Sequence, residues 1–204
     1  MISLNNNIMG IIFMTLGMFC LSVNDVVVKG LNISFPVWEV IFFRAFSGIL
    51  VSFVLIFIFG WKSLKTKKPI RHFVRAFSAV GCVIFYFFGL KFLLLSENIA
   101  IVHSAPIFAA LLAVPILGER LGIHRITAIV IGFIGVIIIV KPGTDVFKLV
   151  SILPLISALF MASVYLSTRS LMNTDSSIAI IFYYSLALLI TSIVFSPSDF
   201  AMPN

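Results

Sequence analysis

Seven long apolar segments alternate with short polar stretches along the chain, and this alternation predicts the fold. Each segment is close to the roughly 20 residues that a helix needs to cross about 30 Å of hydrocarbon. The predicted spans are Ile8–Gly30, Pro36–Gly60, Phe73–Leu95, Ile99–Leu117, Ile126–Lys141, Leu149–Leu171 and Ile178–Phe195. We therefore expect an all-α integral membrane protein with about seven transmembrane helices.

The stretch from Ala105 to Pro142 contains the clearest structural unit. Two apolar runs flank a polar elbow that extends from Gly118 to Arg125. A helix satisfies its own backbone hydrogen bonds where water is absent, so the stretch predicts a helical hairpin whose elbow reaches the membrane surface. Pro106 lies in the first run, where a proline can break a helix and free carbonyl groups for a ligand.

Composition leads to the same class of protein. Hydrophobic residues make up 61% of the 204 positions, against about 45–50% in a soluble domain. The mean hydropathy is +1.22 and charged residues are 10% of the chain. Cys20 and Cys82 both lie inside apolar runs, which argues against a disulfide framework. No cofactor is expected, and the bilayer is the expected partner.

The net charge of +7 reflects basic loops, and this explanation is preferred over nucleic-acid binding. Basic residues concentrate in the cytoplasmic loops of membrane proteins. The loops after the second, fourth and sixth spans hold Lys62, Lys65, Lys67, Lys68, Arg71, Arg75, Arg120, Arg125 and Arg169, whereas the other side holds Lys29, Lys91, Lys141 and Lys148. We expect a multi-pass inner-membrane protein with a cytoplasmic N-terminus and an external C-terminal tail.

The two ends of the chain resemble each other. A shift of 140 residues aligns them without a gap, so that Lys29 meets Arg169 and Ile41–Phe43 meets Ile181–Tyr183. The repeat unit then holds five helices. Because five is odd, a second copy enters the membrane from the opposite side, which is the inverted repeat common among secondary transporters.

A set of residues around the elbow also resembles a known family. A proline about twelve residues before Leu-Gly-Glu-Arg, followed by a basic turn and an apolar helix ending near Lys-Pro, is similar to EamA-type transporters of the drug/metabolite transporter superfamily. The matching residues are Pro106, Leu117, Gly118, Glu119, Arg120, Gly135 and Pro142. Among these, Pro106, Gly118, Glu119 and Arg120 form the structural motif that the resemblance implies. The first half of the sequence as a whole is similar to that of family members that carry S-adenosylmethionine or amino-acid-like metabolites.

The resemblance implies ten helices in two five-helix repeats. Residues 1–141 would form the first repeat, and residues 149–204 would form an incomplete second repeat with two helices. We expect either a C-terminally truncated chain that lacks three helices, or a short protein that completes its pore with a second copy in a homo-oligomer. The second Leu-Gly-Glu-Arg hairpin is absent from this sequence.

Several polar residues inside the apolar spans are candidates for binding a solute. Charged side chains there cost roughly 2.5–3.5 kcal/mol at the helix centre on insertion scales, so by default they indicate function. We expect Asp25, Arg44, Tyr86, Lys91 and His103, with Glu97, to line one polar cavity in the outer half or middle of the membrane. The cavity would suit an anionic or zwitterionic solute.

Structural roles remain open for the same residues. Asp25 and Lys29 are four residues apart and could pair with each other on one helix. Lys29 and Lys91 could reach the outer interface, and Arg44 could bind a backbone carbonyl. For Glu119 and Arg120, in the elbow, a structural role at the helix end is favoured over contact with the solute.

The absence of several motifs from the sequence excludes several classes of function. The sequence has no phosphate-binding loop that would drive an ATP motor, no metal-ligand spacing among its histidines and no nucleophile elbow. We expect a protein that is not an enzyme and that transports a small metabolite by alternating access. The alternatives are a structural membrane subunit, a remnant of such a transporter, or an intramembrane enzyme.

Overall fold

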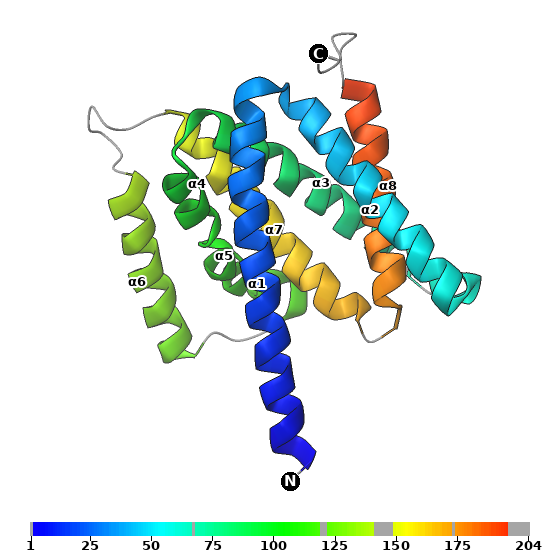
Figure 1. Cartoon of the computed structure of the whole chain (residues 1–204). Coiled ribbons are helices and arrows are strands. Elements are labelled where there is room, and N and C mark those ends of the chain that lie inside the picture. Colours follow the sequence, from blue (N-terminus) through cyan, green and yellow to red (C-terminus); the bar gives the residue numbers. More distant parts are fainter. Residues whose placement is uncertain (1, 67, 119–121, 141–148, 173, 196–204) are drawn as a thin grey trace.

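The chain folds into a bundle of α-helices with two short 3₁₀ helices (Figure 1). The computed structural model describes residues 2–66, 68–118, 122–140, 149–172 and 174–195, and no strand occurs within them. Glu119, Arg120 and the tail 196–204 lie outside the described residues. The elements are α1 (Ile2–Ser34), α2 (Val37–Phe59), η1 (Trp61–Leu64), α3 (Pro69–Phe92), α4 (Leu95–Val102), α5 (Ala105–Leu117), α6 (Ile123–Val140), η2 (Leu149–Ser151), α7 (Ile152–Leu171) and α8 (Ser177–Phe195).

Six helical segments are long and apolar enough to cross a membrane. They are Ile8–Ser34, Val37–Phe59, Pro69–Phe92, Leu95–Ile116, Leu149–Leu171 and Ser177–Phe195. The predicted fifth span corresponds to a shorter apolar helix, Ile123–Ile139. The prediction of an all-α, multi-pass membrane protein is therefore confirmed, with six full-length candidate spans and one shorter helix at the predicted fifth span.

Prolines and glycines determine where several helices begin and end. The third span begins at Pro69 rather than at Phe73, because a proline in the first helical turn removes an N–H that would have no partner there. Helix α5 ends at Gly118, whose left-handed backbone (φ +66°) lets its N–H bond to the Val114 carbonyl at 3.0 Å. The motif glycine of the elbow therefore acts as a helix cap.

The predicted fourth span is a broken helix. It begins at Leu95 rather than at Ile99, and it divides into α4 and α5 at His103 and Ser104. Pro106 lies in the first turn of α5, where its missing N–H prevents a continuous α-helical ladder. The break thus has the local cause that the sequence indicated.

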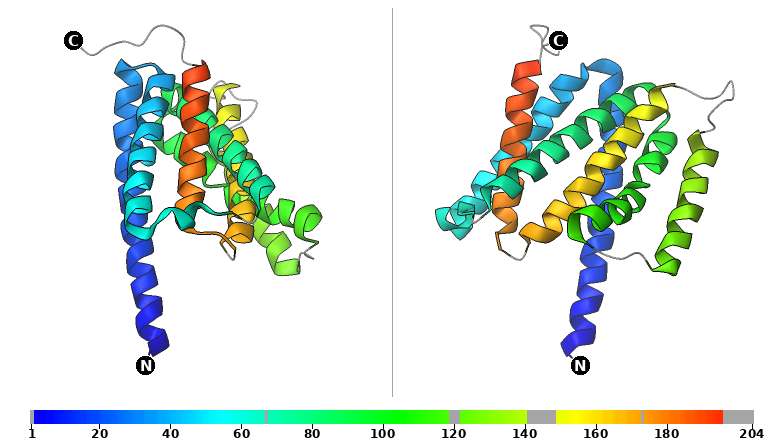
Figure 2. Two further views of the ribbon diagram at one scale, coloured as in Figure 1. Left: turned by 90° about the vertical axis from the view of Figure 1, so that its right-hand side faces the viewer. Right: turned by 180° about the vertical axis from the view of Figure 1, so that it is seen from behind.

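Helices α3 and α7 pack along each other in the middle of the bundle, while α6 stands at its edge (Figures 1 and 2). Both helices carry small buried side chains, among them Ala79 on α3 and Ala158 and Ala162 on α7. Ser157 Oγ also donates to the Cys82 carbonyl at 2.8 Å. Small residues let membrane helices approach closely, so this contact gives the bundle a rigid centre.

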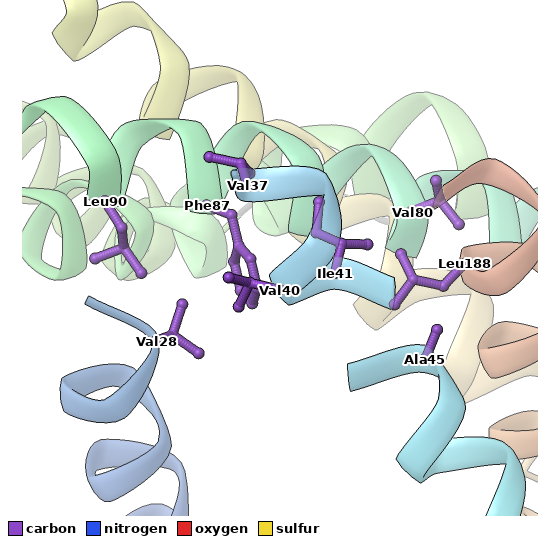
Figure 3. Close-up of a cluster of buried hydrophobic side chains, with 9 residues drawn as sticks. All are labelled: Val28, Val37, Val40, Ile41, Ala45, Val80, Phe87, Leu90 and Leu188. Carbon is purple, nitrogen blue, oxygen red and sulfur yellow. The ribbon is translucent and has the colours of Figure 1, made fainter. Parts of the chain in front are cut away.

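A hydrophobic core joins the remaining long helices to this centre (Figure 3). It lies where α1, α2, α3 and α8 meet, and Ile41, Phe87 and Leu90 are almost fully buried in it. The complete cluster is Val28, Val37, Val40, Ile41, Ala45, Val80, Phe87, Leu90 and Leu188.

The directions of the helices are those that an inverted repeat requires. Helix α7 runs opposite to α1, and α8 runs opposite to α2 (Figures 1 and 2). Helix α2 begins at Val37 and α8 begins at Ser177, which are 140 positions apart, as in the sequence alignment of the two ends. The repeat itself, with boundaries at 1–141 and 149–204, stays a prediction.

Asp175 ties the connection between α2 and α3 to the turn between α7 and α8. Its carboxylate accepts hydrogen bonds from Thr66 Oγ1 at 2.5 Å and from His72 Nε2 at 2.7 Å. The side chain of Asp175 is 0% exposed and that of His72 is 5% exposed. Ser176 Oγ adds a bond to the Ser63 carbonyl at 2.5 Å. This polar cluster joins the two predicted repeats at one end of the bundle.

We expect Asp175→Asn to destabilise the protein by about 3 kcal/mol, because the substitution removes the buried carboxylate that accepts hydrogen bonds from Thr66 and His72. Thermal unfolding in detergent measures this change. Thr174→Ala is the matched control in the same turn, since its hydroxyl bonds to the nearby Leu171 carbonyl. Equal unfolding temperatures for the two variants would show that the pair does not hold the helices together.

Candidate functional site

A cavity of about 340 Å³ lies between α1, α2, α3, α4, α5 and α7. Pockets of about 300–1,000 Å³ are typical of small-molecule sites. Most of its wall is apolar, with contributions from Met18, Val83, Phe87 and Met161. Its polar lining consists of Ser22, Asn24, Asp25, Arg44, Cys82, Tyr86, His103 and Tyr165. A few polar groups in an apolar pocket are the arrangement that orients a bound solute.

Arg44 enters this cavity from α2 and is held by two contacts. Its Nη1 donates to Asn24 Oδ1 on α1 at 2.8 Å, and its guanidinium lies 5.7 Å from the centre of the Phe87 ring. Ring faces attract cations at this distance. This hydrogen bond is to a side-chain oxygen, whereas the sequence had left open a bond from Arg44 to a backbone carbonyl. The guanidinium is half-buried and lines the cavity.

Asp25 provides the negative charge of the cavity. It lies on α1 next to Asn24, and Tyr86 of α3 lies near enough to interact with its carboxylate. Arg44 and His103 lie near enough to interact with it electrostatically. One carboxylate and one guanidinium therefore face the same small space from neighbouring helices.

The break between α4 and α5 forms another part of the wall. His103 is exposed on the cavity side, and its Nδ1 donates to the Ile99 carbonyl at 2.8 Å. Pro106, in the first turn of α5, also lines the cavity. A discontinuous helix beside a polar cavity is a recurring feature of membrane transporters.

The structure brings together four of the five predicted binding residues, Asp25, Arg44, Tyr86 and His103. Lys91 is not among them, because its side chain is exposed at the end of α3 and outside the cavity. Glu97 is also outside, at the first turn of α4, where it accepts from the Leu94 backbone N–H at 3.4 Å. Both residues lie in the terminal turn of a helix, beyond the residues that line the cavity, and their side chains therefore lie outside the site.

Lys29 has a structural role instead of the predicted pairing with Asp25. Its Nζ donates to the Leu90 carbonyl at 2.5 Å and to the Leu93 carbonyl at 2.7 Å. These carbonyls lie at the end of α3, where the last turn of a helix lacks partners within the helix. Lys29 therefore caps α3 and leaves Asp25 to face the cavity.

Helix α7 supplies cavity residues that the sequence did not indicate. Met161 and Tyr165 line the cavity from this helix, opposite α1 and α2. Cys82, on α3, also lines it, and its thiol lies 3.4 Å from Ser157 Oγ. None of these residues carries a charge, and an uncharged side chain in an apolar helix gives little signal without knowledge of the helix neighbours.

The helices and the cavity define a class of protein, a multi-pass membrane transporter. The chain belongs to the EamA-like transporter family, whose model matches residues 8–141. The match covers α1 to α6 and includes every cavity residue outside α7.

Named relatives support the same class. The chain is 26% identical to an S-adenosylmethionine uptake transporter of Rickettsia felis over 99% of this chain and 69% of that protein. It is 32% identical to a riboflavin transporter of Vibrio cholerae over 70% of this chain and 48% of that protein. It is 26% identical to a pseudopaline exporter of Pseudomonas aeruginosa over 95% of this chain and 68% of that protein. These names indicate a transporter of small metabolites rather than an enzyme.

The relatives are longer than this chain. It spans 63% of the S-adenosylmethionine uptake transporter of Rickettsia prowazekii and 48% of the Vibrio cholerae protein. No solved structure matches the chain.

Proposed function

We propose that the protein is a secondary transporter that moves a small zwitterionic, amino-acid-like metabolite across the inner membrane by alternating access. The observation that carries this proposal is the pair Asp25 and Arg44 in one cavity of about 340 Å³. A zwitterion presents a positive and a negative group a few bonds apart. The two side chains offer the complementary pair of charges from α1 and α2.

Each charge of the cavity has a distinct role in this proposal. Arg44 binds the carboxylate of the solute, since a guanidinium presents several donors in a plane that matches two carboxylate oxygens. Asp25 binds the ammonium group, and the neighbouring Tyr86 lines the same part of the cavity. The rings of Phe87 and Tyr86 supply apolar surface for the rest of the solute.

S-adenosylmethionine is the first solute to test, since it carries an amino-acid head, a positively charged sulfonium and an aromatic base. Relatives named for its uptake align with almost the whole chain. A sulfonium group is a cation that aromatic ring faces attract. Phe87 and Tyr86 on α3 and Tyr165 on α7 place such faces around the cavity.

The proposed orientation places the N-terminus in the cytoplasm. The connection after α2, the start of α6 and the end of α7 lie at the same end of the bundle as the start of α1 (Figures 1 and 2). Basic residues gather at this end, including Lys62, Arg71, Arg125 and Arg169. Such an excess of positive charge supports a cytoplasmic position.

Uptake of radiolabelled S-adenosylmethionine into bacterial cells that express the chain tests the proposal. We expect saturable accumulation above that of vector-only cells, and competition by excess unlabelled solute. Lys91→Gln is the matched control, because Lys91 is exposed outside the cavity, and it is expected to leave uptake unchanged. Uptake equal to the vector control, together with no saturable binding to the purified membrane protein, would contradict the proposal.

A further inference from the structure

A second pocket, of about 610 Å³ and more open to the surface, adjoins the first one. Met161 and Tyr165 line both cavities, so these two side chains form a shared wall between them. The second cavity is otherwise lined by Arg75, Val164, Thr168, Arg169 and Met172. The two cavities are therefore neighbouring chambers along the contact between α3 and α7.

The second chamber lies toward the basic end of the bundle. Along α3, Cys82 lines the first cavity and Arg75 the second. Seven helical residues span about 10 Å. The chambers thus follow one another along α3 and α7, from the Asp25 and Arg44 pair to the end that carries Lys62, Arg71 and Arg169.

Positive charge characterises the second chamber. Arg75 projects from a membrane-spanning helix and is fixed by its Nε bond to Thr168 Oγ1 at 2.9 Å and its Nη1 bond to the Ile180 carbonyl at 3.5 Å. Arg169 lines the same chamber from α7. Guanidinium groups placed in this way attract a carboxylate or a phosphate.

We infer that the second chamber is a transient binding station for the carboxylate of the solute, reached from the first cavity past Met161 and Tyr165. The inference rests on the proposed function and adds a path to it. Arg44 releases the carboxylate, the solute passes the shared wall, and Arg75 and Arg169 bind the carboxylate before it leaves at the basic end. Tyr165 and Met161 act as the barrier that separates the two stations.

Thiol labelling tests this station without measuring transport. Val164→Cys places a thiol in the second chamber, and Ser22→Cys places one in the first. Ser163→Cys is the matched control, because this neighbouring residue lines neither chamber. All three substitutions are made in a protein that carries Cys20→Ser, because Cys20 is exposed. The slow labelling of the buried Cys82 is measured in the Cys20→Ser protein as the background.

We expect an anionic methanethiosulfonate reagent to label Val164→Cys about tenfold faster than a cationic one, since a positively charged cleft concentrates anions. S-adenosylmethionine is expected to slow the labelling of both Val164→Cys and Ser22→Cys. A further Arg169→Gln substitution should reduce the anionic preference and the protection at Val164→Cys, but not the protection at Ser22→Cys. Arg71→Gln, which removes a charge outside the chamber, should leave both unchanged.

The outcomes separate this inference from the proposed function. Protection of Ser22→Cys but not of Val164→Cys would overturn the second station and leave the first binding site standing. Protection of neither variant would overturn both. Protection of Val164→Cys by added phosphatidylglycerol but not by S-adenosylmethionine would assign the chamber to a lipid headgroup and overturn the inference.

Discussion

Replacing Arg44 with alanine is expected to weaken solute binding by roughly 10- to 100-fold. A hydrogen bond to a charged group contributes about 1.5–3 kcal/mol, and each 1.4 kcal/mol changes affinity about tenfold. Among the described residues, Arg44 is the only arginine that lines the cavity. No neighbouring arginine can therefore replace it as the partner of the solute carboxylate. Equilibrium binding of radiolabelled S-adenosylmethionine to the purified protein measures the loss.

Two further variants separate this loss from a structural effect. Arg44 also bonds Asn24 and lies near Phe87, so its removal could disturb the contact between α1, α2 and α3. Arg44→Lys keeps the positive charge but not the planar donors, and it is expected to bind the solute with intermediate affinity. Unchanged binding by Arg44→Ala at normal membrane levels would remove Arg44 from the site.

Asp25→Asn is expected to weaken binding by a similar factor, about tenfold or more, because it removes the charge that pairs with the solute ammonium. The amide has nearly the shape of the carboxylate and can still interact with the Tyr86 hydroxyl, so the fold should be retained. Equilibrium binding with two solutes identifies the group that Asp25 contacts.

S-adenosylmethionine and S-adenosylhomocysteine share the ammonium group, whereas only the first carries the sulfonium charge. If Asp25 binds the ammonium, as we propose, Asp25→Asn weakens the binding of both solutes alike. A loss confined to S-adenosylmethionine would place the sulfonium against Asp25 instead. Full affinity for both solutes would contradict any role of this carboxylate in binding.

Four polar residues of the cavity could be predicted from the sequence because such residues are few and lie well inside apolar segments. Asp25, Arg44, Tyr86 and His103 each interrupt a hydrophobic run, and burial of such groups in hydrocarbon is costly without a partner or a solute. The structure brings these four together in one cavity. Pro106 likewise indicated the break in the fourth span before the structure placed it beside the cavity.

Residues near helix ends could not be predicted in the same way. Lys29, Lys91 and Glu97 differ from the cavity residues only by a turn or two of helix, and their partners are backbone groups or the exposed surface. Whether a charge binds a solute or caps a neighbouring helix depends on where that neighbour ends. The hydropathy pattern locates such ends only within several residues, as Phe73 against Pro69 illustrates.

Contacts between distant segments were also beyond the sequence pattern. Asp175 lies in a turn and bonds His72, 103 positions earlier in the chain. Tyr165 and Met161 become cavity residues only because α7 packs along α3. Methionine and tyrosine are both common in apolar helices, so neither residue marks a binding site in the sequence. Which helices pack together depends on contacts between distant segments, and the local hydropathy pattern does not determine these contacts.

Solute protection of a thiol in the first cavity tests the central claim most directly. Ser22 lines the cavity and Thr15, two turns earlier on α1, does not, although both are exposed and bond to carbonyls of their own helix. With a charged thiol reagent, Ser22→Cys should react faster than Thr15→Cys, and S-adenosylmethionine at ten times its Kd should slow that reaction about tenfold by occupancy. Equal reaction of the two variants, with no effect of the solute on Ser22→Cys, would contradict a solute-binding cavity between Asp25 and Arg44.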